Sequence, residues 1–227
     1  SGALQVILTE VEQVDPTRVD ETAFRVLTQD AVEKLRRELD DFSATLQAPL
    51  PKLVFEEVLS DVELMEAFER CPAGIKHHHA YAGGLLEHVV MLLRLADRVA
   101  SLYPDLDREL LLVGVLVHDI GKTVELENEK GFSYTDSGQL LGHVLLGLEI
   151  VDDKIRKIEE KTGQPFDQEV SNRIKHMVAS HHGEYAFGAP KLPMTLEAIA
   201  LHSIDALDAK LIGTLPVSYT HLTLPTS

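Results

Sequence analysis

The chain has 227 residues, 44% of them hydrophobic, and its 21 Lys and Arg against 37 Asp and Glu give a formal charge of −16. A single cysteine excludes a disulfide framework and favours a reducing, cytoplasmic setting, and no apolar run reaches the roughly 18 residues of a membrane span. The acidic excess argues against a broad nucleic-acid groove on this chain, because a surface that grips a polyanion is usually basic.

The N-terminal segment 4–14 (LQVILTEVEQV) has the β-branched content and rough alternation of a strand, and Pro16 follows it closely. A single strand cannot form a stable structure alone. We therefore expect residues 1–15 to be a remnant strand of a truncated domain, or a strand that adds to a neighbour.

Residues 16–72 are expected to form a helical linker region. Apolar side chains repeat on one face over 21–46, the segment APLP at 48–51 ends that helix, and a further helix is predicted over 53–68. The long helix at 21–46 also offers a surface through which two copies of the chain could pair.

Residues 73–210 have the pattern of one helical bundle. Apolar residues recur three or four positions apart, which is typical of helices with one buried face. The predicted helices cover 84–102, 107–118, 139–161, 167–182 and 195–211. A polar, glycine-punctuated stretch at 125–134 indicates a hairpin or a loop. The expected fold class is all-α, a helical bundle with a small β-hairpin and the N-terminal remnant strand.

The final segment, 211–227, differs in composition from the rest. From residue 212 onwards charged residues disappear, Thr, Ser and Pro dominate, and helical periodicity is lost. We interpret this tail as foreign to the fold and exclude its His221 from the chemistry. A native docking strand is the alternative interpretation.

Histidines and acids recur where the helix pattern predicts core positions. His88 lies on the apolar stripe of its helix, and His118 with Asp119 ends an apolar helix. The other candidates on helix ends or inward faces are His143, His181, His182 and Asp205. A buried imidazole needs partners for its polar atoms. One such residue is most simply a hydrogen-bonded core histidine, but five helices directing such groups at one core indicate a shared metal cluster.

Neutral imidazole and carboxylate groups are the ligands of borderline divalent ions such as Mn, Fe, Zn, Ni or Co. Two ions need about seven or eight donor atoms with positions left open for water. The five histidines and two aspartates of the candidate set suit two ions better than one. The negative charge of the chain is compatible with a phosphate-bearing substrate, because bound cations dominate the local field.

Five sequence words support a resemblance to a known family: HHAYAGGLLEH (78–88), HDIGK (118–122), GHVLLG (142–147), HHGEYAFGAP (181–190) and LHSIDALDAK (201–210). Their order resembles the H…HD…D signature of HD-domain metal-dependent phosphohydrolases, and the additional histidines resemble its two-metal branch. The flanking residues look closest to YhaM-type 3′→5′ exoribonucleases. The resemblance implies an HD domain over 73–210. It also implies a preceding OB-fold domain, of which 1–15 would be the last strand, whereas 211–227 departs from the family.

The resemblance implies a role for each matched residue. The ligands of one ion would be His88, His118, Asp119 and Asp205, and those of the second, shared through Asp119, would be His143, His181 and His182. A hydroxide between the two ions would attack phosphorus. Lys122 would steady the phosphate as charge builds on its oxygens. Manganese is the first candidate for the ions, with Fe, Ni, Co, Zn and Mg as alternatives.

Several of these assignments have alternatives. Asp208 is a rival to Asp205 as a ligand, since both belong to the same sequence word. His182 could contact the substrate instead of a metal, because adjacent residues diverge by about 100° on a helix. Lys122 could be a solvated lysine after a glycine turn.

Two further groups are candidates for the substrate side of the site. We expect His78 and His79 near its mouth, although the triplet 77–79 could also sit in solvent. The loop that contains Glu184, Tyr185 and Phe187 could stack on a base or select one, or could be a plain surface loop.

The activity that the resemblance implies is hydrolysis of phosphodiester bonds in single-stranded RNA or DNA from the 3′ end, with two divalent ions. An HD phosphohydrolase acting on nucleotides or cyclic nucleotides is the first alternative, and the acidic charge favours it. A non-catalytic, nucleotide-binding HD module is the second. The presence of Lys122 and of a full ligand set argues against that module.

Overall fold

The apolar stripes of the sequence become the inner faces of a helical bundle. The computed structural model describes residues 27–74, 81–127 and 133–221. Its helices are α1 (Gln29–Thr45), α2 (Pro49–Ser60), α3 (Val62–Arg70), α4 (Gly84–Ala100), α5 (Arg108–Val117), α6 (Lys122–Glu125), α7 (Asp136–Thr162), α8 (Gln168–Ser180) and α9 (Leu196–His221). The all-α prediction is confirmed. The strand expected at 4–14 lies outside the described residues.

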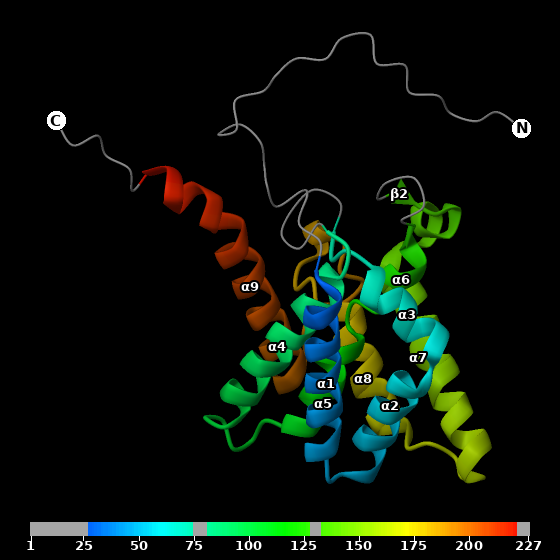
Figure 1. Ribbon diagram of the computed structural model, residues 1–227. Helices are drawn as coiled ribbons and strands as arrows, with labels where there is room; N and C mark the ends of the chain where they lie inside the picture. Colours follow the sequence, from blue (N-terminus) through cyan, green and yellow to red (C-terminus); the bar gives the residue numbers. More distant parts are fainter. Residues whose placement is uncertain (1–26, 75–80, 128–132, 222–227) are drawn as a thin grey trace, which may run out of the picture.

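Helix α5 lies in the middle of the bundle. Every residue from Leu110 to Val117 is buried, because α2, α4, α8 and α9 all pack against this helix. Gly114 permits the close approach of α8, since a Cβ at that position would lie 2.3 Å from the sulfur of Met177. The stretch LLLVGVLV at 110–117, apolar on all sides, is therefore buried on all sides. In Figure 1 the helices that surround α5 form a single bundle.

The prediction of a single helix over 53–68 is wrong, because two helices, α2 and α3, meet at Asp61. Asp61 adopts an extended conformation and its side chain accepts a hydrogen bond from the backbone N–H of Leu64, which makes it the N-cap of α3. Its carboxylate also pairs with the buried ammonium of Lys154 on α7. Aspartate is a strong N-cap, so the chain breaks there although the apolar pattern continues across the break.

Helix α7 is longer than predicted and is kinked. It begins at Asp136, where the hydroxyl of Thr135 accepts from the N–H of Gly138 at 2.9 Å, instead of at 139. Gly142 has φ 73° and ψ 157°, which interrupts the helix one residue before His143. Glycine takes a positive φ at little cost, so a kink at this position is allowed.

A small hairpin precedes α7, as predicted for 125–134. Strands β1 (Leu126–Glu127) and β2 (Ser133–Tyr134) pair antiparallel, with Leu126 opposite Tyr134. The short helix α6 before it was not predicted, because four residues are too few for a periodic pattern.

The last helix does not end at 211. Helix α9 continues to His221 and extends away from the bundle (Figure 1), so the prediction that helical structure is lost from 212 onwards is wrong for 212–221. A helix that is already several turns long adds further residues easily, because the nucleation cost has been met. Whether 211–227 is foreign to the fold stays a prediction. Within the described residues, none of the helices combines the length and apolar character of a membrane span.

The ion pair at the α2–α3 break leads to a stability test. We expect Asp61→Ala to lower the free energy of unfolding by about 2–4 kcal/mol, because it removes a helix cap and the partner of a buried ammonium. Asp61→Asn keeps the cap and should cost less. Glu66→Ala, which removes an exposed pair with Arg70, should cost under about 1 kcal/mol and is the control in urea denaturation.

The same pair should make stability depend on pH. The hydrogen bond from Lys154 and the cap contact hold the pKa of Asp61 below its ordinary value. The stabilisation is therefore present at neutral pH and is lost as the pH falls through that lowered pKa. Wild type and Asp61→Asn should converge in stability on acidification; a constant difference down to low pH would contradict this account.

Candidate metal centre

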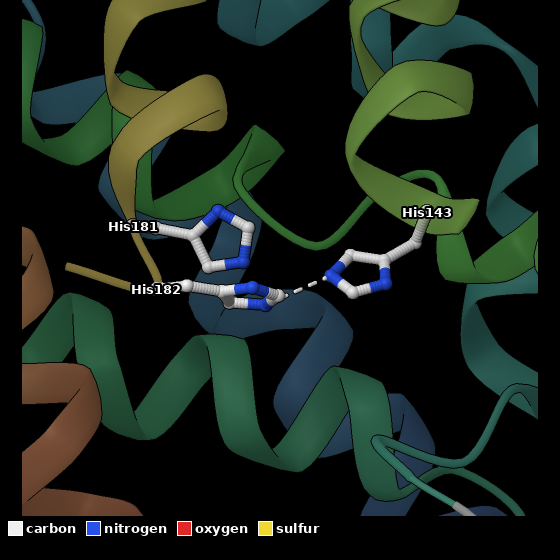
Figure 2. A group of neighbouring side chains, drawn as sticks. All are labelled: His143, His181 and His182. Atoms are coloured by element: carbon white, nitrogen blue, oxygen red, sulfur yellow. Dashed lines mark hydrogen bonds between the residues drawn. The ribbon is translucent and has the colours of Figure 1, made fainter. Parts of the chain in front are cut away.

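The structure brings all seven predicted ligand residues together. His88 comes from α4 and Asp205 from α9, while His118 and Asp119 directly follow α5. His143, His181 and His182 complete the group, and Figure 2 shows their rings turned toward one another, His143 from α7 and the other two from the end of α8. His78 and His79 lie outside the described residues.

Asp119 lies between two sets of imidazoles. Its Oδ2 is 3.3 Å from Nε2 of His118 and 3.9 Å from Nε2 of His88. Its Oδ1 faces the other way and lies 3.5 Å from Nε2 of both His143 and His181. Each carboxylate oxygen therefore faces its own set of nitrogen donors, which is the arrangement that a bridging ligand requires.

His88 contacts the two aspartates that competed as candidates. Its Nε2 lies 3.3 Å from Oδ1 of Asp205, and its Nδ1 lies 3.0 Å from Oδ2 of Asp208. The nitrogen that faces Asp119 is thus the one that meets Asp205. Asp208 binds the far side of the ring, where a carboxylate typically orients a metal-binding histidine.

The ends of α5 and α8 orient two further imidazoles in the same way. Nδ1 of His118 donates to the carbonyl of Val115 at 2.8 Å, and Nδ1 of His181 donates to the carbonyl of Val178 at 2.7 Å. The last carbonyls of a helix lack intrahelical partners, so a histidine just past the end can use them. With the proton on Nδ1, the Nε2 lone pair of each ring points at Asp119.

Several buried polar atoms of this centre have no hydrogen-bond partner among the described residues: His118 Nε2, Asp119 Oδ1, His181 Nε2 and His182 Nδ1. An unpaired buried polar group costs free energy, so native proteins rarely leave one without a reason. A cation would satisfy most of these atoms at once. The donor atoms fall into two groups whose members lie within 4.8 Å of one another, namely His88, His118 and Asp119, and His143, His181 and His182. These donors fit divalent metal ions.

The electrostatics of the site favour neutral His181 and His182 rings beside an ionised Asp119. Burial lowers the pKa of His181, and burial together with the neighbouring His181 and His143 lowers the pKa of His182 to about 4. Burial would raise the pKa of Asp119, but Lys122 and His118 outweigh it and hold that pKa well below its ordinary value. At neutral pH these groups are in the protonation states that bind a metal.

His88 differs from the other imidazoles. Burial would lower its pKa, but the carboxylates of Asp205 and Asp208 outweigh burial and raise the pKa to about 9. A cation bound at Nε2 would take over the position that a proton occupies on this ring, so metal binding here would release a proton at neutral pH.

Lys122 belongs to the centre and is not a solvated lysine. Its ammonium donates to Oδ2 of Asp119 and to the backbone carbonyl of Ala73, both at 2.6 Å. It lines a cleft of about 490 Å³, together with metal-centre residues, Phe187 and Lys210. Its role toward a substrate stays a prediction.

Two residues of the centre were not predicted. Glu125 lies 3.2 Å from Nδ1 of His143, and His202 lies 2.9 Å through its Nδ1 from the carbonyl of His181. A Cβ at Gly183 would lie 2.0 Å from the His202 ring, so the glycine after the double histidine makes room for it. Glu125 lies three residues after the word HDIGK, and His202 lies inside the word LHSIDALDAK, and these were the available signals.

The comparison with protein families bears on this centre directly. The HD-domain profile matches residues 85–210, which contain all seven predicted ligands. The chain belongs to the HD-domain family. Divalent metal binding is what the HD domain implies, and the His and Asp groups described above have the composition for it.

Named relatives of this HD-domain chain are bacterial exoribonucleases. The 3′-5′ exoribonuclease YhaM of Listeria innocua is 44% identical over 140 residues, covering 62% of this chain and 43% of the relative. The proteins of the same name from Bacillus velezensis and Bacillus subtilis are each 39% identical, covering 77% and 76% of this chain and 59% and 58% of their own lengths. The chain thus spans about half the length of the curated relatives it matches. No solved structure matches it.

The position of Asp119 leads to a test of metal content. After loading with Mn²⁺ and desalting, we expect about two ions per chain by mass spectrometry in the wild type. Asp119→Ala should lose both, because each of its two oxygens faces one set of imidazoles, whereas His182→Ala should lose about one. His176→Ala removes an imidazole of α8 whose Nε2 accepts from the N–H of Met194, and serves as the control. Two ions retained by Asp119→Ala would contradict a shared carboxylate.

Proposed function

We propose that the chain is a metal-dependent phosphodiesterase that shortens single-stranded RNA or DNA from the 3′ end. The observation that carries this proposal is the Asp119 carboxylate, whose two oxygens face separate sets of imidazoles. The names of the relatives, 3′-5′ exoribonuclease, support the direction and the polymer.

The proposed ligand sets follow the two groups of donors. His88, His118, Asp119 and Asp205 would hold one divalent ion, and Asp119, His143, His181 and His182 would hold a second. Bound divalent ions supply Lewis-acid polarisation of a phosphoryl oxygen and a lowered pKa for coordinated water. Manganese is the first candidate, and Fe, Ni, Co, Zn and Mg are the alternatives, because imidazole and carboxylate donors suit several of these metals.

Residues of the chain itself would act on the phosphate. The ammonium of Lys122 stands beside Asp119 and lines the cleft, so it can donate to a phosphate oxygen as negative charge builds there. Lys122 and bound cations would supply positive charge at the site. The positive charge of Lys122 and of bound cations would allow a chain of formal charge −16 to hold the terminal phosphodiester of a polyanion.

An aromatic side chain stands at the cleft in a position to stack on a base. Phe187 lines the cleft and is 64% exposed. It belongs to the short 3-10 turn η3 (Tyr185–Phe187), which follows the double histidine by a few residues. Stacking on a terminal nucleobase would explain an exposed phenyl ring there, because every base has a π-face.

The domain division and the setting of the protein form part of the same proposal. We place a helical region at 16–72 and the HD domain at 73–210, with 211–227 outside the HD domain. The packing of α1 on α4 and of α2 on α5 supports a helical region that is joined to the HD domain. The single cysteine, Cys71, is buried, and burial raises its pKa to about 12, which suits an inert thiol in a reducing cytoplasm. Pairing of two copies through 21–46 stays a prediction.

A 5′-labelled single-stranded oligoribonucleotide tests the activity. With Mn²⁺ we expect a descending ladder of labelled products, and no ladder with Asp119→Ala, because cleavage starts at the unlabelled end and needs the shared carboxylate. The acidic charge favours a rival that cleaves nucleotides or cyclic nucleotides; an intact oligonucleotide beside a cleaved mononucleotide would support that rival. Failure to cleave any phosphoester, aryl phosphodiesters included, would point to a non-catalytic module.

Base stacking is tested by a matched pair of substitutions in η3. Phe187→Ala should weaken oligonucleotide binding by about 1–3 kcal/mol, seen as a higher KM, because it removes one stacking surface. Cleavage of a small aryl phosphodiester should not change. Tyr185→Ala removes a side chain that is 65% exposed in the same turn and is the control. Equal effects of both substitutions would contradict a specific role for Phe187.

A further inference from the structure

Glu125 makes two contacts with a single residue of the metal centre. Its Oε1 accepts a hydrogen bond from the backbone N–H of His143 at 3.0 Å and lies 3.2 Å from the ring Nδ1 of the same residue. The carboxylate is buried, with Glu125 only 8% exposed. One buried acid thus holds both the main chain and the ring of His143.

The kink in α7 explains why the main chain of His143 needs this partner. Gly142 is non-helical, so His143 stands in the first turn of the helix that continues to Thr162. The first N–H groups of a helix have no intrahelical acceptor. A carboxylate at a helix start is also favoured by the helix dipole. Glu125 therefore stabilises the kink that aims His143 at the centre.

Close backbone contacts fix the position of the Glu125 main chain. A Cβ at Gly138 would lie 2.3 Å from the Glu125 carbonyl oxygen, and a Cβ at Gly121 would lie 2.0 Å from the His143 carbonyl oxygen. The same Glu125 carbonyl accepts from the N–H of Thr135 at 2.9 Å. Helix α6 and the start of α7 are therefore pressed together by glycines. The distance from the Glu125 backbone to the His143 ring is set by this contact.

The contact with Glu125 also selects the tautomer of His143. An ionised carboxylate only accepts hydrogen bonds, so Nδ1 must carry the proton. Nε2 then presents a lone pair, and it lies 3.5 Å from Oδ1 of Asp119 and 3.2 Å from Nε2 of His182. His181, in the same donor group, gets its tautomer from a backbone carbonyl, which no substitution of Val178 removes. The tautomer of His143 depends instead on a side chain, that of Glu125.

We propose that Glu125 is the positioning residue of His143 and thereby sets the affinity of the second cation, the one assigned to His143, His181 and His182. This inference rests on the proposed two-ion function. Outer partners of metal-binding histidines typically change metal affinity by about 10–100-fold when they are removed. The ion assigned to His88, His118 and Asp205 should be unaffected, because Asp208 orients His88 and the Val115 carbonyl orients His118.

Two substitutions separate the effect of the side-chain length at position 125 from the effect of its negative charge. Glu125→Gln keeps the length of the side chain and an acceptor oxygen but removes the charge, whereas Glu125→Asp keeps the charge but withdraws it by one methylene. A positioning role predicts that Glu125→Asp weakens the second Mn²⁺ by about 10-fold or more and Glu125→Gln by less. A role through charge alone predicts the reverse order. Calorimetric titration of the metal-free protein with Mn²⁺ measures both steps.

A second measurement does not depend on metal. Long-range ¹H–¹⁵N correlation spectra of the metal-free protein should report the Nδ1–H tautomer for His143 in the wild type and in Glu125→Gln, and a mixture of tautomers in Glu125→Asp. His181 should remain Nδ1–H in all three, which also shows that each variant is folded. Glu127→Gln, in β1, is the control and should match the wild type in both measurements.

The outcomes distinguish this inference from the function on which it rests. Two wild-type Mn²⁺ sites with Glu125→Asp equal to the wild type would overturn the role of Glu125 and leave the two-ion function standing. A greater loss in Glu125→Gln than in Glu125→Asp would also overturn positioning. A wild type that binds fewer than two ions would overturn both proposals.

Discussion

The burial of one charged carboxylate at the centre of an apolar bundle governs the design of this protein. Asp119 follows the buried helix α5 and is itself only 3% exposed, so its charge has little contact with bulk water. A buried ion is costly unless partners compensate it from every side. The ammonium of Lys122, 2.6 Å from Oδ2, provides part of that compensation, and a cation bound between the carboxylate and the imidazoles would provide the rest. Four helices other than α5 deliver polar groups to this point: α4, α8 and α9 pack against α5, and α7 packs against α8.

Helix ends and a kink, more than helix faces, aim these groups. His118 and His181 stand just past the ends of α5 and α8 and use the last carbonyls of those helices. His143 follows the interruption at Gly142 and uses the carboxylate of Glu125. Unsatisfied backbone groups at helix termini thus become the devices that orient the rings. An identical chemical result, a proton on Nδ1 and a lone pair on Nε2, is reached by backbone and side-chain partners alike.

The fold could largely be predicted from the sequence because its helices obey a simple period. Apolar residues three or four apart located α4, α5 and α8 within a few residues of their bounds. Errors occurred where a local hydrogen bond overrides the period. The cap at Asp61 divides one apolar run into α2 and α3, and the cap at Thr135 starts α7 earlier than its apolar stripe. Such caps depend on backbone angles that composition does not reveal.

The sequence by itself determined which residue types meet in the centre, because burying several histidines and aspartates in one core is costly unless they share a bound cation. Only the tertiary structure decided how they are used. Asp205 and Asp208 lie three residues apart on one face of α9, so periodicity cannot tell which of them is the ligand. The structure distinguishes them, because Nε2 of His88 faces Asp205 and Nδ1 faces Asp208. Glu125 has no periodic signal at all, since its importance arises where α6 meets α7. Distances between helices depend on packing, which no single segment of the sequence contains.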